Sequence, residues 1–268
     1  EKLRHPLIFY FGHTATFFIN KLVLAKAISQ RINPKFESLF AIGVDEMSWD
    51  DLHDENYHWP AVSDVAEYRN KVRALVCDLI DKLEFTMPID WESPMWPIVM
   101  GIEHERIHLE TSSVLIRQLP LSMVSASSAR PVCPNCTFAE SELPQNSLVP
   151  VKAGHVDATK SWDSAYYGWD NEYGTRTVTT PDFHASKYMI TNGEFLEFVK
   201  AGGYRTEEYW SEDGWGWKKF RNAKEPFFWK WDGPQGSFRF KLRTIFEEVP
   251  MPWDAPVCVN HHEAKAYC

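Results

Sequence analysis

The chain has 268 residues, of which 44% are hydrophobic and 24% charged, and its formal net charge is -9 at pH 7. This composition is typical of a globular protein of one or two domains. The negative charge argues against nucleic acid and anionic membrane as partners, because both need a basic face. We expect no membrane span, since polar residues interrupt the most apolar segment, Phe9 to Ile28.

The cysteines and the ends of the chain indicate its setting. Five cysteines without framework spacing favour a reducing compartment, and we expect the cytoplasm. The chain starts at Glu1 instead of Met and stops at Cys268 inside a helical pattern, so we interpret it as a fragment.

Three long helices are predicted in the first part of the chain. The first runs from Leu7 to Ile28, and Asn33-Pro34 ends that segment. The second has Ser63 as its N-cap and continues to about Leu83, with apolar residues at helical spacing. The third begins around Pro94 and Pro97 and ends near Leu119. Three such helices predict an up-down bundle, and bundles commonly build metal sites from facing helices.

Two segments without periodicity are predicted to be irregular. The acidic stretch from Ser38 to Trp59 is interpreted as a solvated loop, and residues 122–148 as a linker between domains. Cys133 and Cys136 form a C-x-x-C motif in this linker. We regard the motif as incidental, because no second ligand pair or βαβ pattern accompanies it.

The rest of the chain predicts shorter elements of mixed type. Strands are expected at Asp182–Ile190 and Phe238–Ile245, and helices at Thr191–Ala201 and His262–Cys268. The aromatic-rich stretch Trp210–Trp231 is predicted to be a loop.

The third helix carries two histidines on one face. His104 and His108 are four residues apart, so their imidazoles can meet one metal ion without distortion of the helix. His13, on the first helix, is either a buried core histidine or a third ligand. Three histidines would suit zinc with a bound water, or Fe(II) with open positions.

Two other interpretations of the same helix remain open. His104-Glu105-Arg106-Ile107-His108 satisfies the H-E-x-x-H pattern of zinc peptidases, in which Glu105 would be the general base. A third ligand is not evident downstream for that role. Alternatively, both histidines are merely polar residues of a bundle that binds a partner without catalysis.

Several motifs together resemble one family. The chain is similar to OvoA-type 5-histidylcysteine sulfoxide synthases of ovothiol biosynthesis, relatives of the ergothioneine sulfoxide synthases. The motifs that carry the resemblance are H-x3-H-x-E at His104–Glu110, Phe11–Ala15, Arg31–Glu37, Gly43–Asp50, Tyr167–Gly174, Tyr188–Val199, Pro250–Trp253 and Glu263–Cys268.

The resemblance implies an α+β protein. Residues 1–121 would be a DinB-like helical bundle, and residues 149–268 an incomplete domain like the formylglycine-generating enzyme, of C-type-lectin-like topology. It further implies non-haem Fe(II) held by His13, His104 and His108, with Glu110 in the second shell of the metal.

The resemblance also implies a reaction that couples L-cysteine to C5 of L-histidine with dioxygen. Substrate carboxylates need cationic partners, for which Arg69 and Arg73 are candidates. The related synthases use a tyrosine of the second domain near the iron, and we expect this tyrosine beyond Cys268. The related ergothioneine-type enzymes, which use trimethylhistidine, place Gln before the second motif histidine, where this chain has Ile107. That difference favours the histidine-using branch.

Overall fold

The computed structural model describes residues 4–41, 57–125 and 145–268. They form two compact units, each described by itself below. The helical unit comprises residues 1–114 and 156–178, and the mixed unit comprises residues 115–155 and 179–268. The predicted acidic loop lies largely outside the described residues, and so does the C-x-x-C motif at Cys133 and Cys136.

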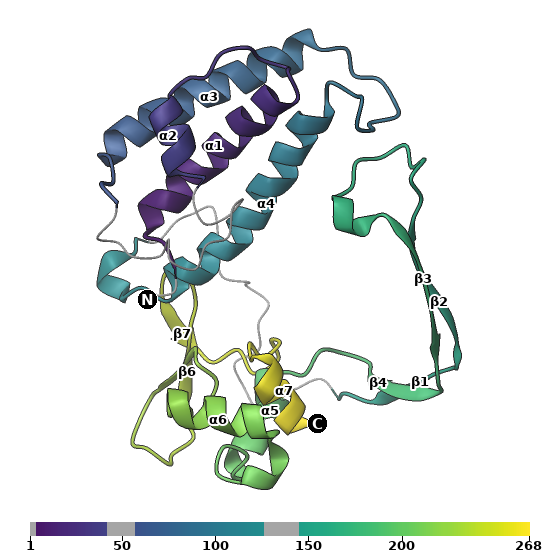
Figure 1. Ribbon diagram of the computed structural model, residues 1–268. Coiled ribbons are helices and arrows are strands. Elements are labelled where there is room, and N and C mark those ends of the chain that lie inside the picture. Colours follow the sequence, from purple (N-terminus) through teal and green to yellow (C-terminus); the bar gives the residue numbers. More distant parts are fainter. Residues whose placement is uncertain (1–3, 42–56, 126–144) are drawn as a thin grey trace. The chain divides into compact units, whose positions relative to one another are not determined.

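The helical unit is built on three long helices, as the apolar periodicity predicts. They are α1 (Leu7–Leu24), α3 (Val62–Lys82) and α4 (Trp96–Arg117), and Figure 1 shows α1 beside α3. Their core contains side chains with no exposed surface, among them Ile19, Leu22 and Ile98. Burial of these apolar faces stabilises the bundle by about 25 cal/mol for each Å² removed from water.

The beginning of α3 differs from the prediction. Its N-cap is Ala61, which makes no side-chain cap hydrogen bond, and Ser63 lies inside the first turn. Ser63 instead donates to the Oδ1 atom of Asp64 at 3.4 Å. The helix therefore starts without a polar cap, and the pattern of a capping serine was misleading here.

A short helix, α2 (Pro34–Leu39), follows α1 at the position where the sequence predicted only the end of the first helical segment. Asn33 is its N-cap, and the Asn33 Oδ1 atom accepts the backbone N–H of Phe36 at 3.2 Å. Pro34 at the first helical position removes a donor that would have no helical partner. Six residues are too few to show a helical period, which explains why the pattern did not reveal this helix.

One described helix, α1, is long and apolar enough by length and composition to cross a membrane, although the sequence pattern suggested that no segment reached this length. More than half of α1 is buried against its neighbours in the helical unit. Core helices commonly satisfy the same criterion, and we interpret α1 as one of them.

The sequence did not reveal the strand pair β2 (Gly154–Lys160) and β3 (Gly174–Thr180). Every residue of both strands is exposed or half-buried, so neither strand has the buried apolar face that produces a strand pattern in the sequence. Residues between the strands pack with the bundle. Tyr167 lies 4.6 Å from Trp96 between ring centroids, and the Ile89 N–H donates to the Ala165 carbonyl at 2.9 Å.

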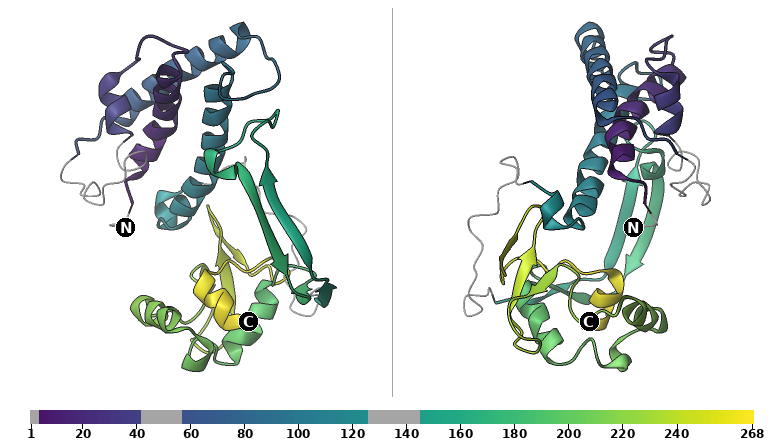
Figure 2. Two further views of the ribbon diagram at one scale, coloured as in Figure 1. Left: turned by 45° about the vertical axis from the view of Figure 1, so that its right-hand side comes forward. Right: turned by 90° about the vertical axis from the view of Figure 1, so that its left-hand side faces the viewer.

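In its described residues, the mixed unit contains two small antiparallel sheets and the three α-helices α5, α6 and α7. In one sheet β1 pairs with β4, and in the other the strand order is β5-β6-β7. Figure 2 shows this unit from two directions, and α6 packs against α7. The bounds are β1 (Leu148–Val151), β4 (Phe183–Ser186), α5 (Asn192–Lys200), α6 (Glu212–Arg221), β5 (Trp229–Trp231), β6 (Phe240–Arg243), β7 (Glu248–Pro250) and α7 (His261–Tyr267).

The helix predicted after Thr191 is confirmed as α5, and the strand at Phe240–Arg243 and the final helix are confirmed as well. The prediction of a loop from Trp210 to Trp231 is wrong, because this stretch contains α6 and β5. Two glycines and a mostly exposed surface hid α6, which is capped by the Ser211 hydroxyl accepting the Gly214 N–H at 3.2 Å. The α+β class is confirmed.

Aromatic side chains fill the core of the mixed unit. Trp229 and Phe240 lie 5.0 Å apart between ring centroids, and Phe195 is 1% exposed. A buried polar pair closes this core, because the Tyr204 hydroxyl donates to the Glu263 Oε1 atom at 2.5 Å. The core therefore fixes α5 and α7 to the small sheet.

Candidate metal centre

Three histidines from two helices meet inside the helical unit. The Nε2 atom of His104 lies 3.2 Å from the Nε2 atom of His13 and 3.2 Å from that of His108. All three ligand atoms lie within 4.8 Å of one another. The structure thus brings together the three residues that the sequence and the family resemblance single out, and α1 supplies the residue that spacing alone left uncertain.

Two of the three nitrogen pairs have the spacing expected of ligands on one metal ion. Two histidine nitrogens bound at about 2.0–2.1 Å to the same ion lie roughly 3 Å apart, which agrees with the two distances of 3.2 Å. His13 is 1% exposed and His104 is 7% exposed, so two of the three imidazoles are withdrawn from solvent. A set of neutral nitrogens suits Fe(II) as well as zinc.

A backbone carbonyl orients His13. The His13 Nδ1 atom lies 2.7 Å from the carbonyl oxygen of Phe40, which can only accept. His13 therefore carries its proton on Nδ1, and the lone pair on Nε2 faces the other two histidines. Histidine ligands of metals commonly have such a second partner, which fixes the tautomer and the ring orientation.

Two aromatic rings of α1, one turn before and one turn after His13, stack on histidines of the site. Phe17 stacks on His104 with ring centroids 3.7 Å apart and an angle of 7° between the planes. Phe9 stacks on His13 at 5.2 Å and 15°. Phe9, His13 and Phe17 are spaced by four residues and so form one stripe of α1. This spacing was visible in the sequence, although it was not recognised as support for the histidines.

The second nitrogens of His104 and His108 differ from that of His13. Within the described part of the chain, the Nδ1 atoms of both residues are buried without a hydrogen-bond partner. Stacking and packing therefore orient these two rings among the residues described. Unpartnered buried nitrogens are unusual, and here they mark where further hydrogen bonds would complete the site.

The environment keeps the imidazoles of His104 and His108 neutral. Burial, with His13 and His108 nearby, lowers the pKa of His104 to about 3. Burial and His13 lower the pKa of His108 to about 4, while Glu105 partly opposes this shift. Neutral imidazoles are the form that binds a cation, so the site is ready to bind metal at neutral pH.

The two candidate arginines have different environments. Arg69 donates to the Phe11 carbonyl at 2.6 Å and to the Thr14 hydroxyl at 2.8 Å, which ties α3 to α1. It also lies 3.6 Å from the Glu105 carboxylate. Arg73 is exposed on α3. Arg69 thus contacts both helices that carry the histidines, and the role of either arginine in substrate binding stays a prediction.

Two further residues of the H-x3-H-x-E motif lie on the exposed side of α4. Glu110 is exposed, and no hydrogen bond joins its side chain to the three histidines among the described residues. Its proposed position in the second shell stays a prediction. Ile107 is 46% exposed, so an apolar side chain faces out of the bundle just before His108.

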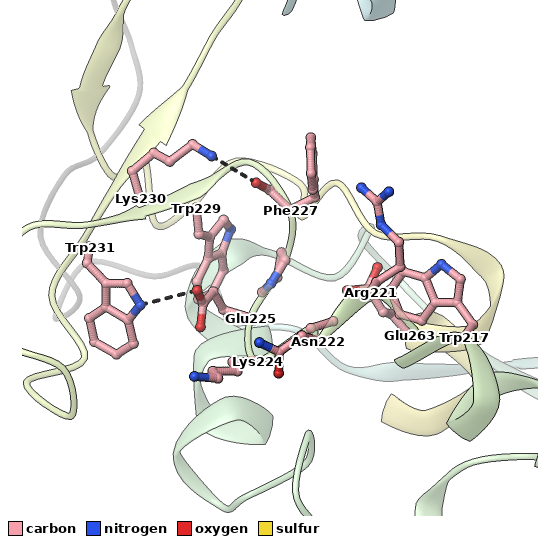
Figure 3. Close-up of a pocket in the computed structure, with 12 residues that line it drawn as sticks. Trp217, Arg221, Asn222, Lys224, Glu225, Phe227, Trp229, Lys230, Trp231 and Glu263 are labelled. Atoms are coloured by element: carbon pink, nitrogen blue, oxygen red, sulfur yellow. Dashed lines mark hydrogen bonds between the residues drawn. The ribbon is translucent and has the colours of Figure 1, made fainter. Parts of the chain in front are cut away.

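The mixed unit contains a separate pocket that the sequence did not reveal. It has a volume of about 290 Å³, and Figure 3 shows the residues that line it. Aromatic and cationic side chains form much of its wall, namely Trp217, Trp229, Trp231, Arg221, Lys224 and Lys230. The pocket falls in the aromatic-rich stretch that was predicted to be a loop.

Two carboxylates also line this pocket. Glu263 accepts hydrogen bonds on both oxygens, from the Tyr204 hydroxyl and from the Asn260 N–H. Glu225 accepts the indole N–H of Trp231 at 3.2 Å on Oε1, while its buried Oε2 atom has no hydrogen-bond partner among the described residues. Burial raises the pKa of Glu225. This pocket therefore differs from the histidine cluster in donors and in chemistry.

Comparison with known proteins agrees with this architecture. Residues 1–112 match the DinB superfamily, and residues 135–268 match the sulfatase-modifying factor enzyme 1-like domain. The chain is 30% identical over 200 residues to hercynine oxygenase of Mycolicibacterium thermoresistibile. This alignment covers 73% of this chain and 40% of the relative. It is 30% identical over 209 residues to hercynine oxygenase of Mycolicibacterium smegmatis, covering 76% of this chain and 44% of the relative.

A fungal relative has the same pattern. Ergothioneine biosynthesis protein 1 of Neurospora crassa is 27% identical over 213 residues, which is 74% of this chain and 24% of the relative. The chain thus spans less than half the length of each of these relatives.

The fold and the histidine cluster define the chain as an α+β protein with a DinB-type helical bundle that precedes a second domain. The second domain covers half of the chain, and through it the chain belongs to the sulfatase-modifying factor enzyme 1-like family. Its relatives named here are proteins of ergothioneine biosynthesis and hercynine oxygenases. They do not single out the ovothiol branch that the motifs suggested.

Proposed function

We propose that this chain carries the metal centre of an oxygen-dependent non-haem iron sulfoxide synthase. The observation that carries the proposal is the convergence of the His13, His104 and His108 Nε2 atoms in a bundle of the DinB type. The similarity to hercynine oxygenases supports it from a different direction. When bound, Fe(II) would supply open coordination positions and the electrons that activate dioxygen.

The residues of the chain have definite tasks in this proposal. His13 is held in the Nδ1–H tautomer by Phe40, so its Nε2 lone pair is directed at the ion. Phe17 keeps the ring of His104 in place and shields it from water. His108 is only half-buried, which makes its side of the site the one open to substrates. Glu105 is paired with Arg69 and is not needed as a base.

The proposed reaction balances in atoms and electrons. A thiol loses its S–H hydrogen, and an imidazole carbon loses its C–H hydrogen, when the C–S bond forms. The sulfur also gains one oxygen atom. One atom of dioxygen ends in the sulfoxide, and the other leaves as water with the two hydrogens. Fixing the thiol sulfur beside the imidazole carbon accelerates such a step by proximity.

The relatives favour a histidine derivative as the imidazole substrate. Two of them are named hercynine oxygenase, and hercynine is trimethylhistidine. We therefore propose hercynine before histidine, with cysteine as the thiol. Free histidine is the second candidate, because Ile107 stands where the ergothioneine-type pattern has Gln.

Oxygen uptake by the full-length, Fe(II)-loaded protein tests the proposal. We expect uptake that requires both cysteine and an imidazole substrate, with the coupled sulfoxide detected by mass spectrometry. Hercynine and histidine are compared at equal concentrations, and the faster substrate identifies the branch. His104→Gln removes a proposed ligand and should lower turnover by more than the roughly 10- to 100-fold typical for loss of an outer hydrogen bond, whereas Glu105→Gln should leave turnover nearly unchanged. Stoichiometric zinc, with casein cleavage abolished by Glu105→Gln, would instead establish a peptidase.

A further inference from the structure

The short helix α2 is attached to α1 at two points. At its C-terminal end, the Phe40 carbonyl accepts the Nδ1–H of His13 at 2.7 Å. On its other side, the carbonyl of Glu37 accepts the Asn20 Nδ2–H at 3.1 Å. His13 and Asn20 are seven residues apart, so they lie on the same face of α1 two turns from each other. The position of α2 therefore determines where the Phe40 carbonyl meets His13.

A buried carboxylate holds α2 in this position. The Glu37 Oε1 atom accepts the backbone N–H groups of Ile32 and Asn33, both at 2.9 Å. The Glu37 Oε2 atom is paired with Arg31 Nη1 at 3.0 Å. The same Arg31 nitrogen donates to the Asn20 Oδ1 atom at 2.7 Å. A network of charged and polar groups thus joins the entry to α2, its carboxylate and α1.

Burial of the Glu37 carboxylate costs free energy. The Glu37 side chain is completely buried, and a buried carboxylate is costly unless it is fully hydrogen-bonded. All its partners here are donors, so the network satisfies both oxygens. Glutamine could not replace it, because its amide nitrogen would face either two backbone N–H groups or the Arg31 guanidinium.

We propose that Glu37 is a positioning residue of the metal centre, which holds α2 so that the Phe40 carbonyl fixes the tautomer and orientation of His13. A helix of six residues does not persist by itself. Without the Glu37 network, apolar packing alone would hold α2, and the Phe40 carbonyl would no longer be fixed at hydrogen-bond distance from His13. The His13 proton would then be free to change between Nδ1 and Nε2.

Nitrogen-15 NMR of the histidine rings in metal-free protein tests the tautomer directly. In the parent protein we expect the His13 signals of a pure Nδ1–H tautomer. In Glu37→Gln we expect signals of mixed tautomers. Co(II) binding, followed by its visible absorption, should weaken by about 10- to 100-fold in the same variant, the range typical for loss of an outer hydrogen bond.

Val76→Ala provides the control, because Val76 is buried in α3 and takes no part in the network. It should lower the melting temperature but leave the His13 tautomer and the Co(II) affinity unchanged. Asn20→Ala is a second test that removes the link to α1 and keeps the carboxylate, and it should show the Glu37→Gln effects in weaker form. An unaltered tautomer and affinity in a folded Glu37→Gln or Asn20→Ala protein would overturn the inference.

This inference rests on the proposed metal centre only for its second measurement. If the parent protein binds no Co(II), the metal proposal fails while the tautomer measurement still decides the role of Glu37. If the parent protein binds Co(II) and the variants bind it equally well, only the role of Glu37 is refuted.

Discussion

Gly12 lies where α1 approaches the aromatic ring of Phe40. A Cβ atom built on Gly12 would come within 2.6 Å of three carbons of that ring. Phe40 is completely buried, so its ring cannot move away into solvent. The next residue is His13, whose Nδ1–H is bonded to the carbonyl of the same Phe40. The absence of a side chain at residue 12 thus permits the contact that orients the first histidine.

We expect Gly12→Ala to destabilise the protein by about 1–3 kcal/mol, the usual cost of overpacking a core, although alanine favours helices by about 1 kcal/mol. Gly216 in α6 is the control, because nothing lies within 4 Å of a Cβ atom there. Gly216→Ala should leave stability unchanged or raise it by up to about 1 kcal/mol. Urea unfolding of both variants measures the difference. Equal effects of the two substitutions would contradict this account of Gly12.

The metal-site residues illustrate how far single residues can be predicted. His104 and His108 are four apart in a helix with strong periodicity, so their common face follows from the chain itself. His13 needed the family resemblance, because no local pattern distinguishes a ligand from a core histidine. The Phe40 carbonyl could not be predicted, since a backbone oxygen leaves no trace in residue type.

At the scale of elements, the start of α5 can be predicted from the sequence. The Thr191 hydroxyl accepts the N–H of Glu194 at 3.2 Å, and the Glu194 carboxylate accepts the Thr191 N–H at 2.8 Å. Asn146 also donates to Glu194 at 3.0 Å. This reciprocal capping explains why the Thr-x-x-Glu pattern predicted the helix correctly.

Thr191→Ala removes the capping hydroxyl at a residue that is 3% exposed. We expect a loss of about 1 kcal/mol in the free energy of unfolding, the typical value for such a cap. Thr191→Ser keeps the hydroxyl and should lose less. Thermal unfolding of the two variants side by side provides the measurement, and an equal loss in both would assign the effect to packing of the methyl group instead.

Elements without their own pattern were missed for a common reason. In α6 most side chains are exposed or half-buried, and β2 and β3 have no buried face. The six residues of α2 span fewer than two turns. In each of these segments, a short length or the lack of a buried apolar face left the sequence without a clear periodicity.

At the scale of the whole molecule, the histidine cluster links stability to pH. The folded protein lowers the pKa of His104 to about 3 and of His108 to about 4, whereas an unfolded histidine titrates near 6.5. Below about pH 6.5 the unfolded chain therefore binds more protons than the folded chain. The contribution of these two histidines to the free energy of unfolding is fully present above this pH and is lost as the pH is lowered toward 4.

We expect the melting temperature of metal-free protein to fall by about 5 °C between pH 7 and pH 5. The double variant His104→Gln, His108→Gln should have a smaller slope over this interval, because glutamine does not titrate. Differential scanning calorimetry in matched buffers measures both slopes. Identical slopes would mean that other groups, such as carboxylates, account for the pH dependence.

The sequence by itself determined the three long helices and the common face of His104 and His108, because periodicity acts over a few neighbouring residues. Only the tertiary structure decided that α1 brings His13 within 3.2 Å of His104 and that the Phe40 carbonyl orients it. It also decided that residues 156–178 pack with the bundle. Those features depend on which distant segments contact each other. The packing of helix and strand faces determines these contacts, and a local sequence pattern does not specify it.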